Sequence, residues 1–67
     1  MLFSMKVNIE KIKKELVRRS WGVTQLAQES GLSRQVLYDV YKSRTCSLKT
    51  ISSIAQALEY DGKDLLQ

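Results

Sequence analysis

The sequence contains no histidine, no proline and only one cysteine, Cys46. Without histidine, a histidine-based catalytic triad and the usual zinc ligand sets are excluded. One cysteine cannot form an intramolecular disulfide, and a small secreted domain without disulfides would be unusual, so we expect a cytoplasmic protein. The sequence also lacks a phosphate-binding loop and a convincing pair of carboxylates. We therefore expect no enzyme, no cofactor, no metal site and no small-molecule ligand.

Long apolar segments are absent as well. No stretch approaches the roughly 20 apolar residues of a membrane-spanning helix, so we expect no membrane partner. The segment before Lys6 is too short for a signal peptide. We predict that residues 1–7 form an N-terminal arm and that residues 8–67 form a single domain. A chain near this size buries only about 60% of the surface that its unfolded form exposes, so closely packed helices suit it better than a large catalytic cleft.

Basic residues outnumber acidic ones by 11 to 7, and they are unevenly distributed. Residues 1–20 contain six basic and two acidic side chains, residues 21–49 contain four and two, and residues 50–67 contain one and three. The first two-thirds of the chain is thus basic and its last part acidic, which favours binding of a polyanion on one side of the molecule. Charge alone leaves open that these residues form a solvated surface that only keeps the protein soluble.

Apolar residues recur at intervals of three and four, which predicts helices rather than strands. We expect helices at about 8–19, 23–29, 34–41 and 48–59, and one final turn at 63–67. The predicted inward-facing residues are Ile9, Ile12, Leu16, Leu26, Ala27, Leu37, Val40, Leu48, Ile51, Ile54, Ala55, Leu58, Leu65 and Leu66. No segment alternates apolar and polar residues over the length of a strand. The predicted fold class is all-α, a compact domain of five helices.

Small polar residues and a glycine mark the helix boundaries. Asn8, Ser33 and Ser47 stand where N-caps are expected, because their side-chain oxygens can accept a hydrogen bond from a free backbone N–H. Gly31 is expected to end the second helix in the left-handed conformation, which costs glycine no steric strain. Residues 43–46 are expected to form a loop in which Cys46 is an ordinary thiol.

The segment 21–40, WGVTQLAQESGLSRQVLYDV, has the spacing of a helix-turn-helix. Ala27 is small where two helices must cross closely, and Gly31 follows four residues later. Leu37 and Val40 then hold the third helix against the second. Two helices joined at a wide angle by a short glycine-containing turn can place the second of them in the major groove of DNA.

Three sequence features extend this pattern beyond the turn. They are Leu-Ala in the second helix, Gly-Leu-Ser-Arg before the third, and Ser-Leu-Lys-Thr-Ile followed by Ile-Ala-Gln-Ala-Leu in the fourth. With them the chain resembles the lambda-repressor-like (Xre/Cro) DNA-binding domains over about residues 8–66. The resemblance implies a five-helix fold and a bacterial or phage repressor, commonly a homodimer on a palindromic operator of double-stranded DNA.

The sequence departs from this family at two places. Many relatives begin the second helix with Ser or Thr followed by a phosphate-binding Gln, whereas Gly22 and Val23 occupy those positions here. The loop after the third helix also lacks the usual glycine and has Lys42, Ser43 and Arg44 instead. The first departure removes one phosphate contact that the resemblance would otherwise imply.

The outward face of the third helix is expected to contact base edges. By position in the family, the base-contacting residues are Arg34, Gln35, Tyr38 and Asp39. Arginine can pair with guanine and glutamine with adenine, and aspartate can accept a hydrogen bond from cytosine. The Tyr38 ring is expected at a thymine methyl or a sugar, or its hydroxyl at a phosphate. The sequence leaves open that Gln35 and Asp39 are merely solvated and that Tyr38 packs on the surface.

Phosphate contacts require hydrogen-bond donors around the same helix. The candidates are Thr24, Gln25, Ser33, Lys42, Arg44 and Thr45. In the family that the chain resembles, the first helix lies mostly away from the groove, so its basic residues are expected to be solvated. Trp21 is expected to hold the first helix to the second.

Two other functions remain open from the sequence. The same fold could serve protein contacts, as an anti-repressor or an antitoxin-like partner, but an apolar and aromatic third helix would then be expected. RNA binding would favour a series of aromatic residues that stack on bases, which this sequence lacks. The sequence thus favours a transcriptional regulator that binds double-stranded DNA.

Overall fold

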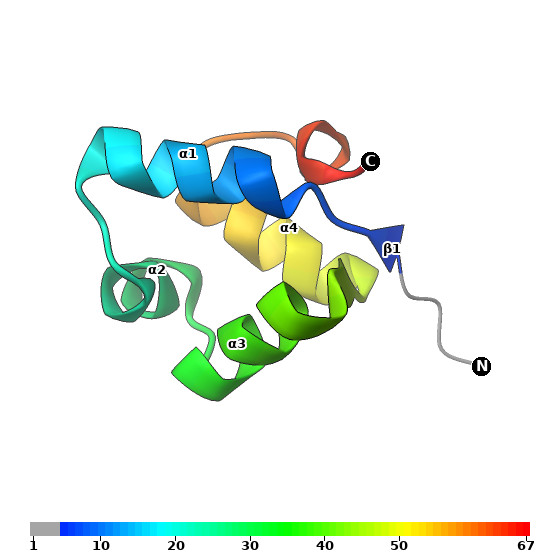
Figure 1. The fold of residues 1–67 in the computed structure, drawn as a ribbon, viewed down its shortest axis with the longest axis horizontal. Coiled ribbons are helices and arrows are strands. Elements are labelled where there is room, and N and C mark those ends of the chain that lie inside the picture. Colours follow the sequence, from blue (N-terminus) through cyan, green and yellow to red (C-terminus); the bar gives the residue numbers. More distant parts are fainter. Residues whose placement is uncertain (1–4) are drawn as a thin grey trace.

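Four α-helices account for most of residues 5–67, the part of the chain that the computed structural model describes (Figure 1). In chain order the elements are β1 (Met5–Lys6), α1 (Ile9–Arg19), α2 (Val23–Ser30), α3 (Arg34–Ser43), β2 (Thr45–Cys46), α4 (Leu48–Ala57) and a 3-10 turn, η1 (Gly62–Leu65). The prediction of a compact, mostly helical fold is confirmed. The predicted fifth helix is corrected to the single turn η1.

Side-chain caps explain why the helices begin where the sequence predicts. The side chain of Asn8 accepts a hydrogen bond from the backbone N–H of Lys11 at 3.1 Å. Ser33 and Ser47 accept the equivalent bond from the third residue of α3 and of α4, at 3.1 and 3.3 Å. All three N-caps are therefore confirmed.

The helix ends differ more from expectation. Gly31 has a φ of 73°, which confirms its left-handed conformation. Ser20, Arg44 and Glu59 also have positive φ values, of 58°, 60° and 63°. The sequence did not reveal these three turns because none of them uses glycine. Consequently α3 runs two residues longer than predicted, and α4 ends two residues earlier.

Valine at position 31 is expected to destabilise the domain by about 1–2 kcal/mol, because a β-branched residue fits the left-handed conformation poorly. Apart from its own chain neighbours, no heavy atom of residues 5–67 lies within 4 Å of the place that a Cβ would occupy at Gly31, so backbone strain rather than a clash sets the cost. Thermal unfolding followed by circular dichroism should give Gly31→Val a lower midpoint. Gly31→Asn should recover most of the loss, since asparagine adopts this conformation more readily. Equal midpoints for wild type and Gly31→Val would contradict the turn assignment.

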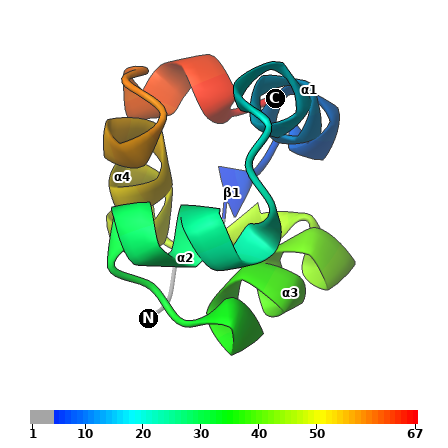
Figure 2. The same ribbon diagram turned by 90° about the vertical axis from the view of Figure 1, so that its left-hand side faces the viewer.

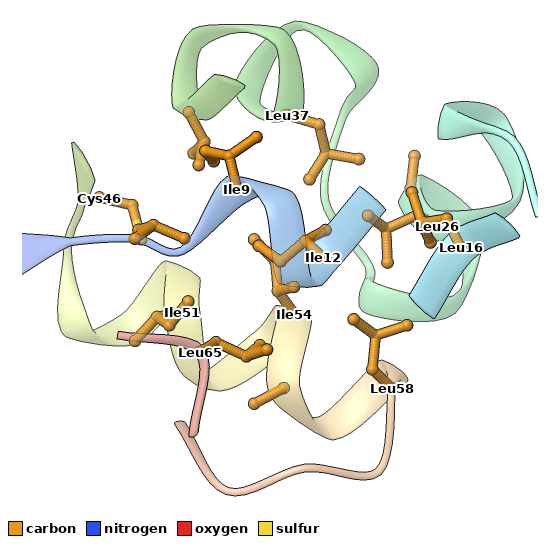
Figure 3. Packing of buried hydrophobic residues seen from close by; sticks show 14 residues of the cluster. Ile9, Ile12, Leu16, Leu26, Leu37, Cys46, Ile51, Ile54, Leu58 and Leu65 are labelled. Carbon is orange, nitrogen blue, oxygen red and sulfur yellow. The ribbon is translucent and has the colours of Figure 1, made fainter. Parts of the chain in front are cut away.

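The core lies between the apolar faces of the four helices (Figure 3). Its buried apolar residues are Val7, Ile9, Ile12, Leu16, Leu26, Ala27, Leu37, Val40, Cys46, Ile51, Ile54, Ala55, Leu58 and Leu65. The predicted inward-facing residues are confirmed, with Leu66 partly buried, except that Leu48 is 65% exposed. Leu48 is the first residue of α4, and it lies on the apolar face of this helix beyond the part that other elements cover. The prediction of Leu48 as a core residue is therefore wrong.

A short antiparallel ladder that the sequence did not predict joins the start of the chain to the loop after α3. β1 pairs with β2, so that Met5 stands opposite Cys46 and Lys6 opposite Thr45. Strands of two residues are too short to produce a periodic pattern, which is why they were not expected. Cys46 is correspondingly a buried core residue rather than a loop thiol, and burial raises the pKa of its thiol.

The end of the segment predicted as an N-terminal arm is part of this packing. Val7 is fully buried, donates its N–H to the carbonyl of Arg44 at 2.9 Å, and forms a β-bridge with Leu66. Residues 1–4 of the predicted arm lie outside the described residues. No helix within residues 5–67 is long and apolar enough to cross a membrane.

One carboxylate, that of Glu15, is buried between α1 and the segment after α4, with 6% of its surface exposed. It accepts hydrogen bonds from Arg18, from Nε of Arg19 at 2.8 Å and from the hydroxyl of Tyr60 at 2.8 Å. Arg19 also donates to the carbonyl of Leu58 at 2.8 Å, which ties α1 to the end of α4. The bonds from Arg18, Arg19 and Tyr60 lower the pKa of Glu15 to about 2.

Acid is expected to destabilise the domain through Glu15. Because its pKa in the folded state lies below its ordinary value of 4.5, its contribution is complete above pH 4.5 and is lost as the pH falls towards 2. Glu15→Gln should therefore lower the Tm by several degrees at pH 7, and the difference from wild type should shrink between pH 4.5 and 2. The exposed Asp64 provides the control, since Asp64→Asn should have little effect at either pH. A difference that stays constant with pH would contradict the stabilising role of the Glu15 charge.

Candidate nucleic-acid interface

The turn between α2 and α3 leaves one side of α3 at the surface. The backbone N–H of Leu32 donates to the carbonyl of Ala27 at 3.1 Å, while Gly31 turns the chain between the two helices. Leu37 and Val40 are buried against the core. The opposite side of α3 consequently faces solvent, and Figure 2 shows this helix at the edge of the domain below α2.

The four predicted base-contacting residues all lie on the exposed side of α3: Arg34, Gln35, Tyr38 and Asp39. Arg34 and Gln35 are the first two residues of the helix, the end that lies nearest base edges in helix-turn-helix complexes. Tyr38 is 52% exposed in spite of its size. The Gln35 side chain donates from Nε2 to Oδ1 of Asp39 at 3.1 Å, one turn further along. These four side chains therefore share the exposed side of α3.

Two of the predicted phosphate contacts lie at opposite ends of this surface. At the start of α3, the Ser33 hydroxyl oxygen accepts a bond from the backbone N–H of Val36, and its hydrogen can still donate elsewhere. At the other end, Lys42 is exposed in the last turn of α3.

Two further candidates lie in the first turn of α2. Thr24 is exposed, whereas Gln25 is half-buried and donates from Nε2 to Oε2 of Glu29 at 2.8 Å. The N-cap of α2 is Gly22, and no side chain caps this helix. The first turn of α2 therefore offers one exposed hydroxyl and one amide that is already engaged.

The last two candidates, Arg44 and Thr45, follow α3 and make contacts that the sequence did not reveal. Arg44 is the left-handed cap of α3, and its Nη2 lies 2.5 and 2.6 Å from the two carboxylate oxygens of Glu10. Thr45 lies in β2, and its hydroxyl donates to the hydroxyl oxygen of Ser43 at 3.2 Å. Arg44 is thus an ion-paired side chain of which 48% is exposed.

Two charged residues near this end of α3, Lys6 and Glu10, were not predicted from the sequence. Lys6 is exposed and stands opposite Thr45 in the ladder. Glu10 lies in the first turn of α1, and the hydrogen bond from Arg44 lowers the pKa of its carboxyl, so the carboxyl is ionised at neutral pH. Glu10 and Arg44 are 34 positions apart in the chain, and local spacing therefore gives no signal that they pair.

Aromatic rings engage several cations of α1. The Arg19 guanidinium lies 5.2 Å from the centre of the Trp21 ring, and Nζ of Lys13 lies 5.6 Å from that of Tyr41. Trp21 is partly buried against the core, and its backbone N–H donates to the carbonyl of Leu16 at 2.8 Å. These contacts attach Trp21 to α1 and to the core.

Comparison with known proteins identifies one protein family. The model of a family described as the Cro/C1-type HTH DNA-binding domain matches residues 11–67, which include all four α-helices except the first two residues of α1. No curated protein and no solved structure is significantly similar to the chain.

Proposed function

Because the chain belongs to the Cro/C1-type helix-turn-helix DNA-binding domains, we propose that it is a sequence-specific transcriptional repressor that inserts α3 into the major groove. Membership of this family implies DNA binding and transcriptional regulation. The observation that carries the finer proposal is the exposed polar side of α3, which stands opposite the buried Leu37 and Val40. Its side chains carry the donors and acceptors that the major groove can match.

Base recognition is proposed for the first two turns of α3. Arg34 would donate to O6 and N7 of guanine, and Gln35 would pair with the N6 and N7 edge of adenine. Gln35 has two amide hydrogens, so its bond to Asp39 leaves one hydrogen and the carbonyl oxygen for that pairing. Asp39 can accept from the amino group of cytosine, and the exposed Tyr38 can contact a thymine methyl or the backbone.

Contacts to the sugar-phosphate backbone are proposed on both sides of this helix. Such contacts fix the register of the protein without specifying sequence. The proposed donors are Thr24, Gln25, Ser33, Lys42, Arg44 and Thr45. The exposed ammonium of Lys42 and the exposed hydroxyls of Thr24 and Ser33 support this assignment. Arg44 and Gln25 differ from these three because both already have partners in the unbound domain, Glu10 and Glu29 respectively.

One copy of the domain presents one recognition helix, so it can contact one half-site. We therefore propose a palindromic operator occupied by two copies, with half-sites about 34–36 Å apart from centre to centre or a multiple of one helical turn. The protein would act in the cytoplasm of a bacterium, where its DNA target lies.

Selection of binding sites from random duplex DNA, at low and at physiological salt, tests the proposed function. We expect a palindromic motif to be enriched, and we expect affinity for the selected duplex to fall steeply with salt as bound phosphates release their counterions. Binding that persists without enrichment of any motif would contradict sequence specificity. The absence of binding to every duplex would overturn the proposal and favour a protein-interaction role for the same fold.

A further inference from the structure

The ion pair between Glu10 and Arg44 joins α1 to the end of the proposed recognition helix. Nη2 of Arg44 lies within 2.6 Å of both carboxylate oxygens. Both side chains face solvent, with 61% of Glu10 and 48% of Arg44 exposed. This pair is therefore open to competition from an anion that approaches from solution.

Both backbone polar groups of Arg44 are hydrogen-bonded, so the position from which its side chain extends is fixed. Its N–H donates to the carbonyl of Val40 at 2.7 Å, and its carbonyl accepts from the N–H of Val7 at 2.9 Å. Position 44 also follows directly after α3, beside the exposed Lys42. A DNA strand held along the polar side of α3 would therefore pass close enough for its phosphates to compete with Glu10.

The negative charge of Glu10 determines how much Arg44 contributes to DNA affinity. An arginine that is already neutralised by a carboxylate releases no counterions from DNA, whereas a free arginine that neutralises a phosphate contributes about 0.9 to the slope of log K against log salt. Moving Arg44 from Glu10 to a phosphate also leaves Glu10 unpaired in the negative potential of DNA. Glu10 thus opposes a phosphate contact by Arg44.

We propose that Glu10 competes with the DNA backbone for Arg44 and thereby lowers affinity for every duplex, whatever its sequence. The proposal rests on the proposed DNA-binding function, and it adds Glu10, which lies outside the helix-turn-helix, as a residue that sets the affinity. It also predicts that the phosphate contact of Arg44 becomes stronger when Glu10 is removed.

The test compares Glu10→Gln, Arg44→Gln, the double variant and wild type on a short labelled duplex of scrambled sequence, over a series of salt concentrations. Asp64→Asn is the matched control, because it removes the same charge from the exposed surface of η1, which lies on the opposite side of the domain from α3 (Figure 2). Circular dichroism establishes that each variant is folded before binding is measured.

Glu10→Gln is expected to bind about three- to tenfold more tightly than wild type at low salt, with a salt slope steeper by about one. Arg44→Gln alone should bind more weakly than wild type, because it leaves the charge of Glu10 unpaired near the DNA, and in the double variant the gain from Glu10→Gln should disappear. Equal tightening by Asp64→Asn would indicate a general effect of net charge and would overturn the proposal. Weaker binding by Glu10→Gln would also overturn it, because Glu10 would then position Arg44 for the phosphate.

The outcomes separate this proposal from the proposed function. If wild type binds duplex DNA while Glu10→Gln behaves as Asp64→Asn does, only the competition between Glu10 and phosphate is contradicted. If neither wild type nor any variant binds a duplex, the proposed DNA-binding function is contradicted, and so is the proposed competition between Glu10 and phosphate.

Discussion

Replacing Leu37 with alanine is expected to reduce the free energy of unfolding by about 2–5 kcal/mol, the range for a buried leucine that leaves a cavity. Leu37 is fully buried and belongs to α3, where it holds the recognition helix against the core. Small domains are marginally stable, with about 5 kcal/mol at the lower end of the usual range. A substantial part of the Leu37→Ala population should therefore be unfolded at 37 °C.

Urea denaturation followed by circular dichroism measures this loss, and Val17→Ala is the matched control. Val17 is 79% exposed, so the same kind of truncation there should change stability by less than about 0.5 kcal/mol. Similar losses for the two variants would contradict the assignment of Leu37 to the core. Because α3 is attached through Leu37, DNA binding by Leu37→Ala should fall with the folded fraction and be partly recovered on cooling from 37 to 25 °C.

The helices of this fold could be predicted because their apolar spacing is a local property of the chain. Ile9, Ile12 and Leu16 lie at the spacing of one helix face, and all three are buried. Leu48 has the same spacing relative to Ile51 but is exposed, because periodicity indicates a direction on the helix and not how far the neighbouring elements extend. The core could thus be predicted in the middle of the helices and less well at their ends.

Features that depend on contacts between distant segments could not be predicted. The pairing of Met5 with Cys46 involves strands of two residues, and no propensity or alternation is visible over so short a length. The left-handed turns at Ser20 and Glu59 occur at residues that do not mark such turns in a sequence. Gly31 could be predicted because glycine has this conformation available at no steric cost.

The candidate site shows the same division. The outward direction of Gln35 and Tyr38 follows from the positions of Leu37 and Val40 on one helix, so the exposed polar side of α3 could be predicted. The state of Arg44 could not, because its partner belongs to another helix. Residue type therefore indicates which side chains can contact DNA, whereas tertiary structure determines which are already engaged.

Base recognition and electrostatic attraction can be separated by substituting Gln35 and Lys42. Gln35→Ala is expected to lose about 1–3 kcal/mol of binding on the selected operator and to relax preference at one base pair, because the alanine can no longer pair with adenine. Lys42→Ala should weaken binding to all duplexes by a similar factor and reduce the salt slope by about one. Both side chains are exposed, so neither substitution removes a core contact.

The comparison requires both variants, each on the selected operator and on a scrambled duplex of the same composition. On the scrambled duplex, Gln35→Ala should have nearly the affinity of wild type, because that duplex has no adenine in the position that Gln35 recognises. Lys42→Ala should bind both duplexes more weakly than wild type does. Asp39→Ala removes the acceptor that Gln35 contacts in the unbound domain and shows whether that bond orients the amide. If Gln35→Ala loses equal affinity on the two duplexes, or loses none, then α3 does not recognise sequence through Gln35.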